Sequence, residues 1–249
     1  PLTLPAHSSL FTGVLPGAHR VLDNGGYRLG TAPPTLAELL KKEGYETGGA
    51  VSCVVLSGST GIARGFDRWE DRIEPSEPGL AANRVQRPGR ETVERLEEWL
   101  GGVKGERFFA FLHLFEPHAP YEAPEPYRSR FADPYDAEVA AADAAVGVFL
   151  DGLKRRGLYE KSLVVFLSDH GEGLGDHGEE EHGVFLYREA LQVPLLVKLP
   201  SAKAGERPPL AGTRVETPVQ LLDVLPTVAD VVGLPGFIPP EGTVSLARL

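Results

Sequence analysis

The chain has 249 residues, which is enough for one large α/β domain or two small ones. Its 35 acidic residues outnumber its 25 Lys and Arg residues. The resulting net charge of −10 argues against a nucleic-acid surface, because attraction to phosphate needs concentrated Lys and Arg. A hydrophobic fraction of 42% excludes wholesale disorder, and a single cysteine excludes an intrachain disulfide. No apolar run approaches the roughly 18 residues of a membrane span. The composition leaves the cellular compartment and the oligomeric state open.

Helical and extended patterns alternate along the chain. Residues 35–43 predict a helix that stops at Gly44, and residues 46–56 predict a strand. Residues 57–90 are rich in Gly, Pro, Ser and Arg and indicate a loop. Residues 91–100 predict a helix closed by two glycines.

Three apolar runs in the second half predict buried strands, at residues 107–115, 163–168 and 193–199. An amphipathic helix is expected before Gly157, and another at residues 217–232 that Pro226 kinks or divides. Strand–helix alternation of this kind indicates right-handed crossovers and a mostly parallel sheet with helices on both faces. Ligands of such sheets bind beyond the carboxyl ends of the strands.

Ionisable side chains follow two of these strands directly. The strand at 163–168 runs into Asp169 and His170, and the strand at 107–115 runs into a segment that contains His118. Carboxylate and imidazole together suit a divalent cation, whereas the alternative is a turn-capping Asp169 beside a surface His170. Downstream, we interpret the three glutamates at 179–181 as a solvated loop and favour a functional role for His182. His177 remains open.

A helix is also expected at the start of the chain, with Pro5 in its first turn and Gly13 at its end. Thr3 would then lie just before the helix N-terminus, where backbone amides attract anions. A hydroxyl held there beside a metal is a plausible nucleophile, because the metal stabilises the alkoxide. The alternative is an ordinary threonine that precedes a helix.

Three segments, in this order and at these distances, resemble the sulfatase family of the alkaline phosphatase superfamily. They are Thr3-Leu4-Pro5-Ala6-His7 followed by Leu10-Phe11-Thr12-Gly13, then Pro117-His118-Ala119-Pro120-Tyr121, and Ser168-Asp169-His170-Gly171-Glu172. The resemblance implies one sulfatase-like α/β hydrolase domain over residues 1–249, with a mixed, mostly parallel central sheet covered by helices. It further implies a divalent metal ion (Ca, Mn or Zn) and hydrolysis of a small anionic ester, either a sulfate or a phosphate.

The resemblance also implies roles for individual residues. Thr3 matches the family nucleophile, which also contacts the metal, and Asp169 and His170 match metal ligands. His118 matches a histidine that contacts the substrate anion. His182 falls where many members keep a lysine that holds the sulfuryl group.

The chain departs from the family pattern at three places. Sulfatases proper carry Cys or Ser, oxidised to formylglycine, at the position of Thr3, and an arginine at the position of His7. Threonine nucleophiles occur in related phosphodiesterases, phosphonate hydrolases and phosphoglycerol transferases. The family also places an acidic metal-binding pair on a strand before the nucleophile and ends in a smaller sheet, so we expect the chain to be truncated at the N-terminus and at the C-terminus.

Three functional hypotheses follow. The leading one is a metal-dependent hydrolase of the sulfatase family in which Thr3 is the nucleophile, His7, His118 and His182 assist it, and Asp169, His170 and Thr3 contact the metal. A phosphoglycerol-type transferase of the same superfamily is an alternative. A non-catalytic sulfatase-like domain is the other.

Overall fold

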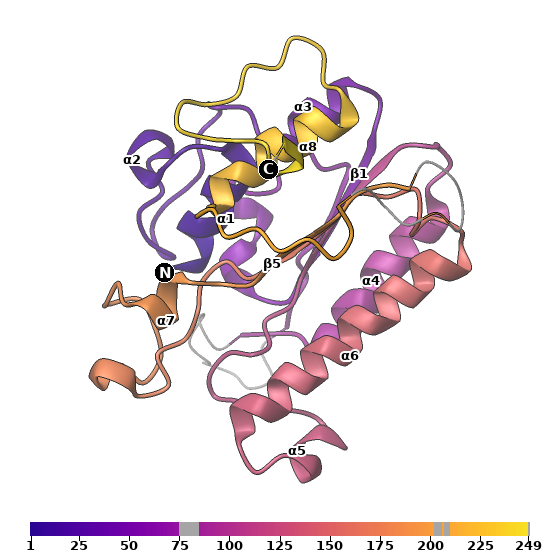
Figure 1. Ribbon diagram of the computed structural model, residues 1–249. Coiled ribbons are helices and arrows are strands. Elements are labelled where there is room, and N and C mark those ends of the chain that lie inside the picture. Colours follow the sequence, from indigo (N-terminus) through magenta and orange to yellow (C-terminus); the bar gives the residue numbers. More distant parts are fainter. Residues whose placement is uncertain (75–84, 202–205, 207–209, 249) are drawn as a thin grey trace. The chain divides into compact units, whose positions relative to one another are not determined.

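A computed structural model describes residues 1–74, 85–201, 206 and 210–248 (Figure 1). The chain forms two compact units. The first contains Pro1–Glu43 and Lys154–Leu249, and the second contains Gly44–Leu153. The chain therefore leaves the first unit, builds the second and returns. No helix in the described part of the chain is both long and apolar enough to cross a membrane.

The second unit contains a three-stranded parallel sheet. Strands β1 (Glu46–Val51), β2 (Arg68–Glu70) and β3 (Phe108–His113) lie in the order β2-β1-β3. The strand expected at 46–56 is thus shorter than predicted, because Val54–Leu56 turns into a 3-10 helix. Strand β2 lies inside the segment that was expected to be loop, and residues 75–84 of that segment fall outside the described residues.

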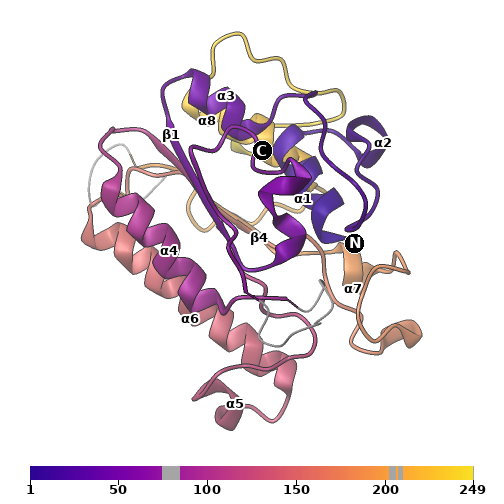
Figure 2. The ribbon, with the colours of Figure 1, turned by 180° about the vertical axis from the view of Figure 1, so that it is seen from behind.

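Helix α4 (Gly89–Gly102) covers one face of this sheet and buries Val93, Leu96 and Leu100. It begins two residues earlier than expected and includes the two glycines that were expected to close it. Helix α6 (Pro134–Arg155) runs alongside α4 in both views (Figures 1 and 2), and the short α5 (Tyr127–Arg130) precedes it. The other sheet face carries stacked aromatic rings, from Phe66, Trp69, Phe109 and Phe111.

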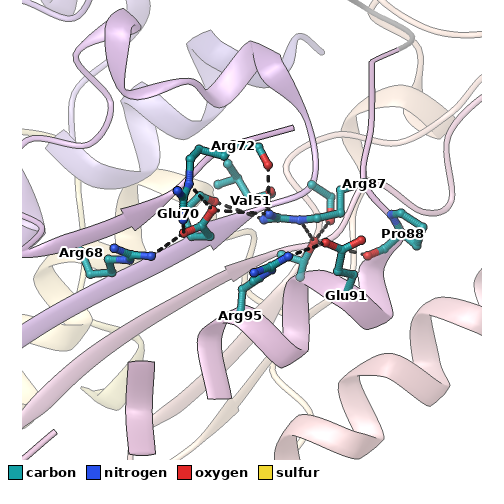
Figure 3. Close-up of polar contacts among 10 residues, drawn as sticks. Val51, Arg68, Glu70, Arg72, Arg87, Pro88, Glu91 and Arg95 are labelled. Carbon is teal, nitrogen blue, oxygen red and sulfur yellow. Dashed lines mark hydrogen bonds and ion pairs between the residues drawn. The ribbon is translucent and has the colours of Figure 1, made fainter. Parts of the chain in front are cut away.

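A buried arginine ties the carboxyl ends of β1 and β2 to the start of α4. Arg87 donates hydrogen bonds to the carbonyl oxygens of Val51 (2.7 Å) and Glu70 (3.2 Å) and to Thr92 Oγ1 (3.1 Å). The buried Glu70 carboxylate accepts a hydrogen bond of 2.7 Å from Arg68 (Figure 3). It also pairs with Arg72 at 3.4 Å and with Arg87 at 3.8 Å. Because the charges are paired, two ionised groups can be buried at this edge of the sheet.

The first unit contains the antiparallel pair β4 (Val164–Leu167) and β5 (Leu195–Lys198), in which Val164 faces Lys198. The last of the three apolar runs is therefore antiparallel to the one before it, which a mixed, mostly parallel pattern of strands allows. A parallel pair needs a crossover that returns the chain to the same end of the sheet, usually a helix. The segment between β4 and β5 holds only the short turns Asp176–Gly178 and α7 (Arg188–Leu191).

Several helices of the first unit pack around α1. Helix α1 (Thr3–Thr12) packs on α2 (Pro16–His19), α3 (Leu36–Lys42), α8 (Val224–Val232) and the 3-10 turn Leu221–Asp223. Gly13 ends α1 with a positive φ of 69°, as expected. Thr35 and Glu38 form a capping box at the start of α3.

The helix expected at 217–232 begins only at Leu221 and is divided at Asp223, not at Pro226. Pro226 lies in the first turn of α8, where a missing backbone N–H breaks no helical hydrogen bond. The chain ends in the 3-10 turn Leu246–Arg248, where the Arg248 guanidinium pairs with Asp230 of α8.

Candidate active site

Thr3 is the first residue of α1 and its side chain is buried at the helix start. The N-cap is Leu2, so Thr3 lies inside the helix and not before it as expected. The backbone N–H of Leu4 donates to Asn24 Oδ1 (2.9 Å), so the protein itself satisfies this first-turn amide, which was expected to attract an anion. Thr3 Oγ1 lies 3.4 Å from His170 Nε2.

Asp169 and His170 follow the end of β4, as the sequence indicated. His170 Nδ1 lies 2.9 Å from the carbonyl oxygen of Gly171, which can only accept, so we assign the ring proton to Nδ1. The unprotonated Nε2 is then the atom that faces Thr3 Oγ1 and that lies 3.6 Å from Asp169 Oδ2. A hydroxyl, an imidazole nitrogen and a carboxylate oxygen are thus neighbours.

His7 completes this group from one turn further along α1. Its Nδ1 donates to the carbonyl oxygen of Thr3 at 2.8 Å and lies 3.4 Å from Asp169 Oδ2. Its side chain is 3% exposed, so bulk water does not compete for these contacts. His7 therefore braces the first turn of α1 and lies beside the Asp169 carboxylate.

His182 also lies in this group and is paired with a carboxylate. His182 Nδ1 is 2.9 Å from Glu172 Oε1, both side chains are less than a tenth exposed, and the His182 ring lies 4.0 Å from that of His170. The sequence indicated no role for Glu172, although this residue lies in the same motif as Asp169 and His170. Its position two residues after His170 was the available signal.

Two glycines allow the chain to bring His182 back to this group. A Cβ atom on Gly171 would overlap the backbone of Glu189, and one on Gly173 would overlap the carbonyl oxygens of Glu179 and Glu181. The N–H of Gly173 also donates to the Glu181 carbonyl at 2.7 Å. Close backbone approach of this kind requires glycine.

His177, which the sequence left open, lies apart from these contacts. It is exposed, stacks on Tyr187 at 3.8 Å between ring centroids and faces Glu189 at 3.4 Å. The Glu179 carboxylate accepts from the backbone of Val184, so it shapes the loop.

His118 belongs to the second unit, whereas the residues above belong to the first. Its Nδ1 lies 2.8 Å from the carbonyl oxygen of Ala119, and its ring stacks on Phe115 at 4.1 Å. The same reasoning as for His170 assigns the proton to Nδ1. Within its own unit His118 is therefore a held imidazole and not a mobile surface side chain.

The comparisons with known proteins agree with the motifs and the fold. The family model described as Sulfatase matches residues 1–234. The chain belongs to the sulfatase family. This family of hydrolases belongs to the alkaline phosphatase superfamily, as the sequence motifs indicated.

Named relatives support this membership. The chain is 33% identical over 101 residues to arylsulfatase K of Bos taurus, covering 41% of this chain and 17% of that protein. It is 32% identical over 149 residues to iduronate 2-sulfatase of Mus musculus, covering 52% of this chain and 26% of that protein. The matched part is thus about a quarter or less of these two relatives.

The fold also matches a solved structure. The phosphonate monoester hydrolase of Agrobacterium radiobacter superimposes with a TM-score of 0.77 at 20% identity, over 98% of this chain and 66% of that one. At this identity the likeness shows the fold, an α/β architecture with a parallel sheet and helices.

Sulfatase-family proteins are typically metal-dependent, and the donor atoms present can be tested against that requirement. Tetrahedral coordination with bonds of about 2.1 Å separates ligand atoms by about 3.4 Å. His170 Nε2 lies 3.4 Å from Thr3 Oγ1 and 3.6 Å from Asp169 Oδ2. Because the ring proton is on Nδ1, Nε2 keeps a lone pair that can bind a metal ion. These atoms fit part of a coordination sphere. Among the described residues, however, no three His, Cys, Asp or Glu side chains are grouped to hold an ion.

Proposed function

We propose that this sulfatase-family chain carries the core of a metal-dependent esterase in which Thr3 is the nucleophile. The observation that supports this most is the 3.4 Å separation between Thr3 Oγ1 and His170 Nε2, beside Asp169. Thr3 starts a helix whose first turn is held by His7 and Asn24, so its hydroxyl has a defined position. Defined positions matter because near-attack geometry accounts for a large part of enzymatic rate.

Each side chain has a role in the proposed reaction. The Thr3 hydroxyl releases its proton to water, and its oxygen forms a bond to phosphorus or sulfur in line with the ester oxygen, whose bond to that atom breaks. His182, oriented by Glu172, donates a proton to the departing oxygen or holds the anion, and His118 contacts the substrate anion. Water then cleaves the Thr3 ester and restores the hydroxyl.

A divalent cation held by Asp169, His170 and Thr3 would supply charge stabilisation for the alkoxide and the non-bridging oxygens. His7 would keep the first turn of α1, and with it Thr3, beside the Asp169 carboxylate. The identity of the ion, whether Ca, Mn or Zn, belongs to the proposal.

The presence of threonine favours phosphate or phosphonate esters over sulfate esters. A formylglycine hydrate has a second hydroxyl that expels sulfate without attack on sulfur, and threonine has no such group. A threonine phosphate can instead be cleaved by water, because the charge stabilisation that formed it also assists its hydrolysis. The proposed substrate is therefore a small phosphodiester or phosphonate monoester.

The test compares nitrophenyl phosphodiester, phosphonate and sulfate esters with the full-length protein in Mn, Zn or Ca. We expect faster turnover of the phosphorus esters and loss of activity in Thr3→Ala, with an unchanged circular dichroism spectrum because Thr3 makes no capping bond. Thr3→Ser should keep partial activity, and the exposed Thr213→Ala is the matched control. A preference for sulfate, or full activity in Thr3→Ala, would show that the nucleophile is wrong.

A further inference from the structure

The segment that carries His118 is anchored by two carboxylates, of which one is half-buried and the other buried. It follows β3, and the first carboxylate is its own Glu116, whose Oε1 accepts a hydrogen bond of 2.8 Å from the N–H of Gly89 at the start of α4. The second is Glu138 of α6, whose Oε2 accepts a hydrogen bond of 3.0 Å from the N–H of His118. The segment is therefore attached to both helices that follow the sheet strands.

Glu138 is 3% exposed and also receives a backbone hydrogen bond from Glu122, on the far side of the segment. Burial raises the pKa of its carboxyl, the Glu116 and Glu122 charges act in the same direction, and the two backbone hydrogen bonds oppose them. A buried acid among other acids is costly. It needs a reason beyond packing, because an apolar side chain could fill the same space.

The reason lies in the geometry of the His118 ring. Its Nδ1 donates to Ala119 O, one residue along the backbone that Glu138 holds, and the ring stacks on Phe115. The side chain of Tyr121 packs edge-on against Tyr135, one turn before Glu138 on α6. Residues of α6 thus fix the backbone that positions the ring. They also fix the carbonyl oxygen that determines its tautomer.

We infer that Glu138 is a positioning residue that holds the His118 segment so that the imidazole keeps its proton on Nδ1 and presents Nε2. The catalytic meaning of this inference rests on the proposed function, in which His118 contacts the substrate anion. The tautomer itself is a property of the folded chain and can be measured without any substrate.

The first experiment reads the tautomer by long-range ¹⁵N–¹H NMR of the full chain at about pH 8, where ordinary imidazoles are neutral. The variants are Glu138→Gln, Glu138→Ala and the exposed Asp136→Asn, a matched control on the same helix. We expect an Nδ1-protonated His118 in the native protein and the control. Mixed tautomers are expected in Glu138→Ala, with Glu138→Gln intermediate because its amide offers one acceptor to two N–H donors.

The second experiment measures activity in a double-mutant cycle with His118→Ala. Glu138→Ala should lower kcat/KM by about 10- to 100-fold, the range for groups that orient a catalytic side chain. In the His118→Ala background the same change should cost less than about twofold, because a positioning residue acts only through its target. If Glu138→Ala does not fold, Glu138→Gln replaces it in the cycle.

The outcomes separate the two ideas. Failure of the native protein to hydrolyse any ester contradicts the proposed function and leaves the NMR result to decide on Glu138. An Nε2-protonated His118 in the native protein, an unchanged tautomer in every Glu138 variant, or fully additive losses in the cycle would overturn the inference.

Discussion

His19 is a buried histidine whose protonation state is set by its neighbours. Its Nδ1 accepts from the N–H of Val21 at 3.2 Å, so its Nε2 carries the proton and donates to Ser9 Oγ at 3.0 Å. Burial lowers the pKa of His19 below its ordinary value of 6.5. A second proton on Nδ1 would face the Val21 N–H, so the hydrogen bonds also favour the neutral ring. This pair ties α1, which carries Thr3, to α2.

This environment predicts a pH-dependent stability. The unfolded chain protonates His19 near its ordinary pKa, whereas the lowered pKa makes the folded chain take up this proton only at lower pH. The contribution of His19 to the free energy of unfolding should therefore be complete above about pH 7. It should be lost as the pH drops through 6.5, by at most about 1.4 kcal/mol per pH unit. Urea unfolding from about pH 8 to about pH 5 measures it.

The variant His19→Gln keeps a donor and an acceptor but cannot titrate, so its loss of stability over this range should be smaller. The exposed His177→Gln is the control and should behave as the native protein does. Equal pH dependence in His19→Gln and the native chain would contradict the assignment.

At the scale of elements, strand β1 is unusual because two adjacent glycines occupy its middle. A Cβ atom on Gly48 would overlap the Trp99 ring of α4, and one on Gly49 would overlap the Trp69 ring on the opposite face. Each indole thus lies directly on the strand backbone. Glycine in a strand interior marks such close approach, so the pair explains how α4 and the aromatic layer both reach β1.

We therefore predict that Gly48→Val destabilises the protein by about 1–3 kcal/mol, although valine favours strands more than glycine does. Urea denaturation measures the change. Gly101→Ala in α4 is the matched control, because nothing lies within 4 Å of its added Cβ. That change should stabilise the chain by about 0.5–1 kcal/mol. A stabilising Gly48→Val would refute the close packing of Trp99.

At the scale of the whole molecule, the donor atoms of the described residues predict weak metal binding by the 249-residue chain. One carboxylate, one imidazole and one hydroxyl are few ligands, and affinity follows ligand number and charge. We expect Mn, Zn or Ca at about tenfold its dissociation constant to add about 1.4 kcal/mol of stability. In a chain of this size that raises the melting temperature by a few degrees.

Asp169→Asn should abolish this shift, whereas the exposed Asp176→Asn should leave it unchanged. Calorimetry gives the dissociation constant directly. An affinity of micromolar or tighter, or a shift that survives in Asp169→Asn, would show that the ligand set is different.

Local patterns in the sequence were sufficient for the parts of the fold that are themselves local. The apolar runs placed β3 and β4, Pro5 and Gly13 bounded α1, and the motif around Asp169 indicated the family. These placements succeeded because a helix end or an apolar strand depends on residues a few positions apart. The full burial expected of these strands was wrong, since β3 is half-buried and Phe166 of β4 is exposed.

Tertiary structure alone decided which distant residues meet. The antiparallel pairing of β5, the strand β2 inside an expected loop, and the contacts of Glu172 with His182 and of Glu138 with His118 depend on the path of the intervening chain. A glutamate in an acidic loop and one that accepts a hydrogen bond from the backbone of a distant segment have the same local pattern. Only the burial and the partners that the folded chain provides distinguish them, because these determine whether the carboxylate is solvated by water or by protein N–H groups.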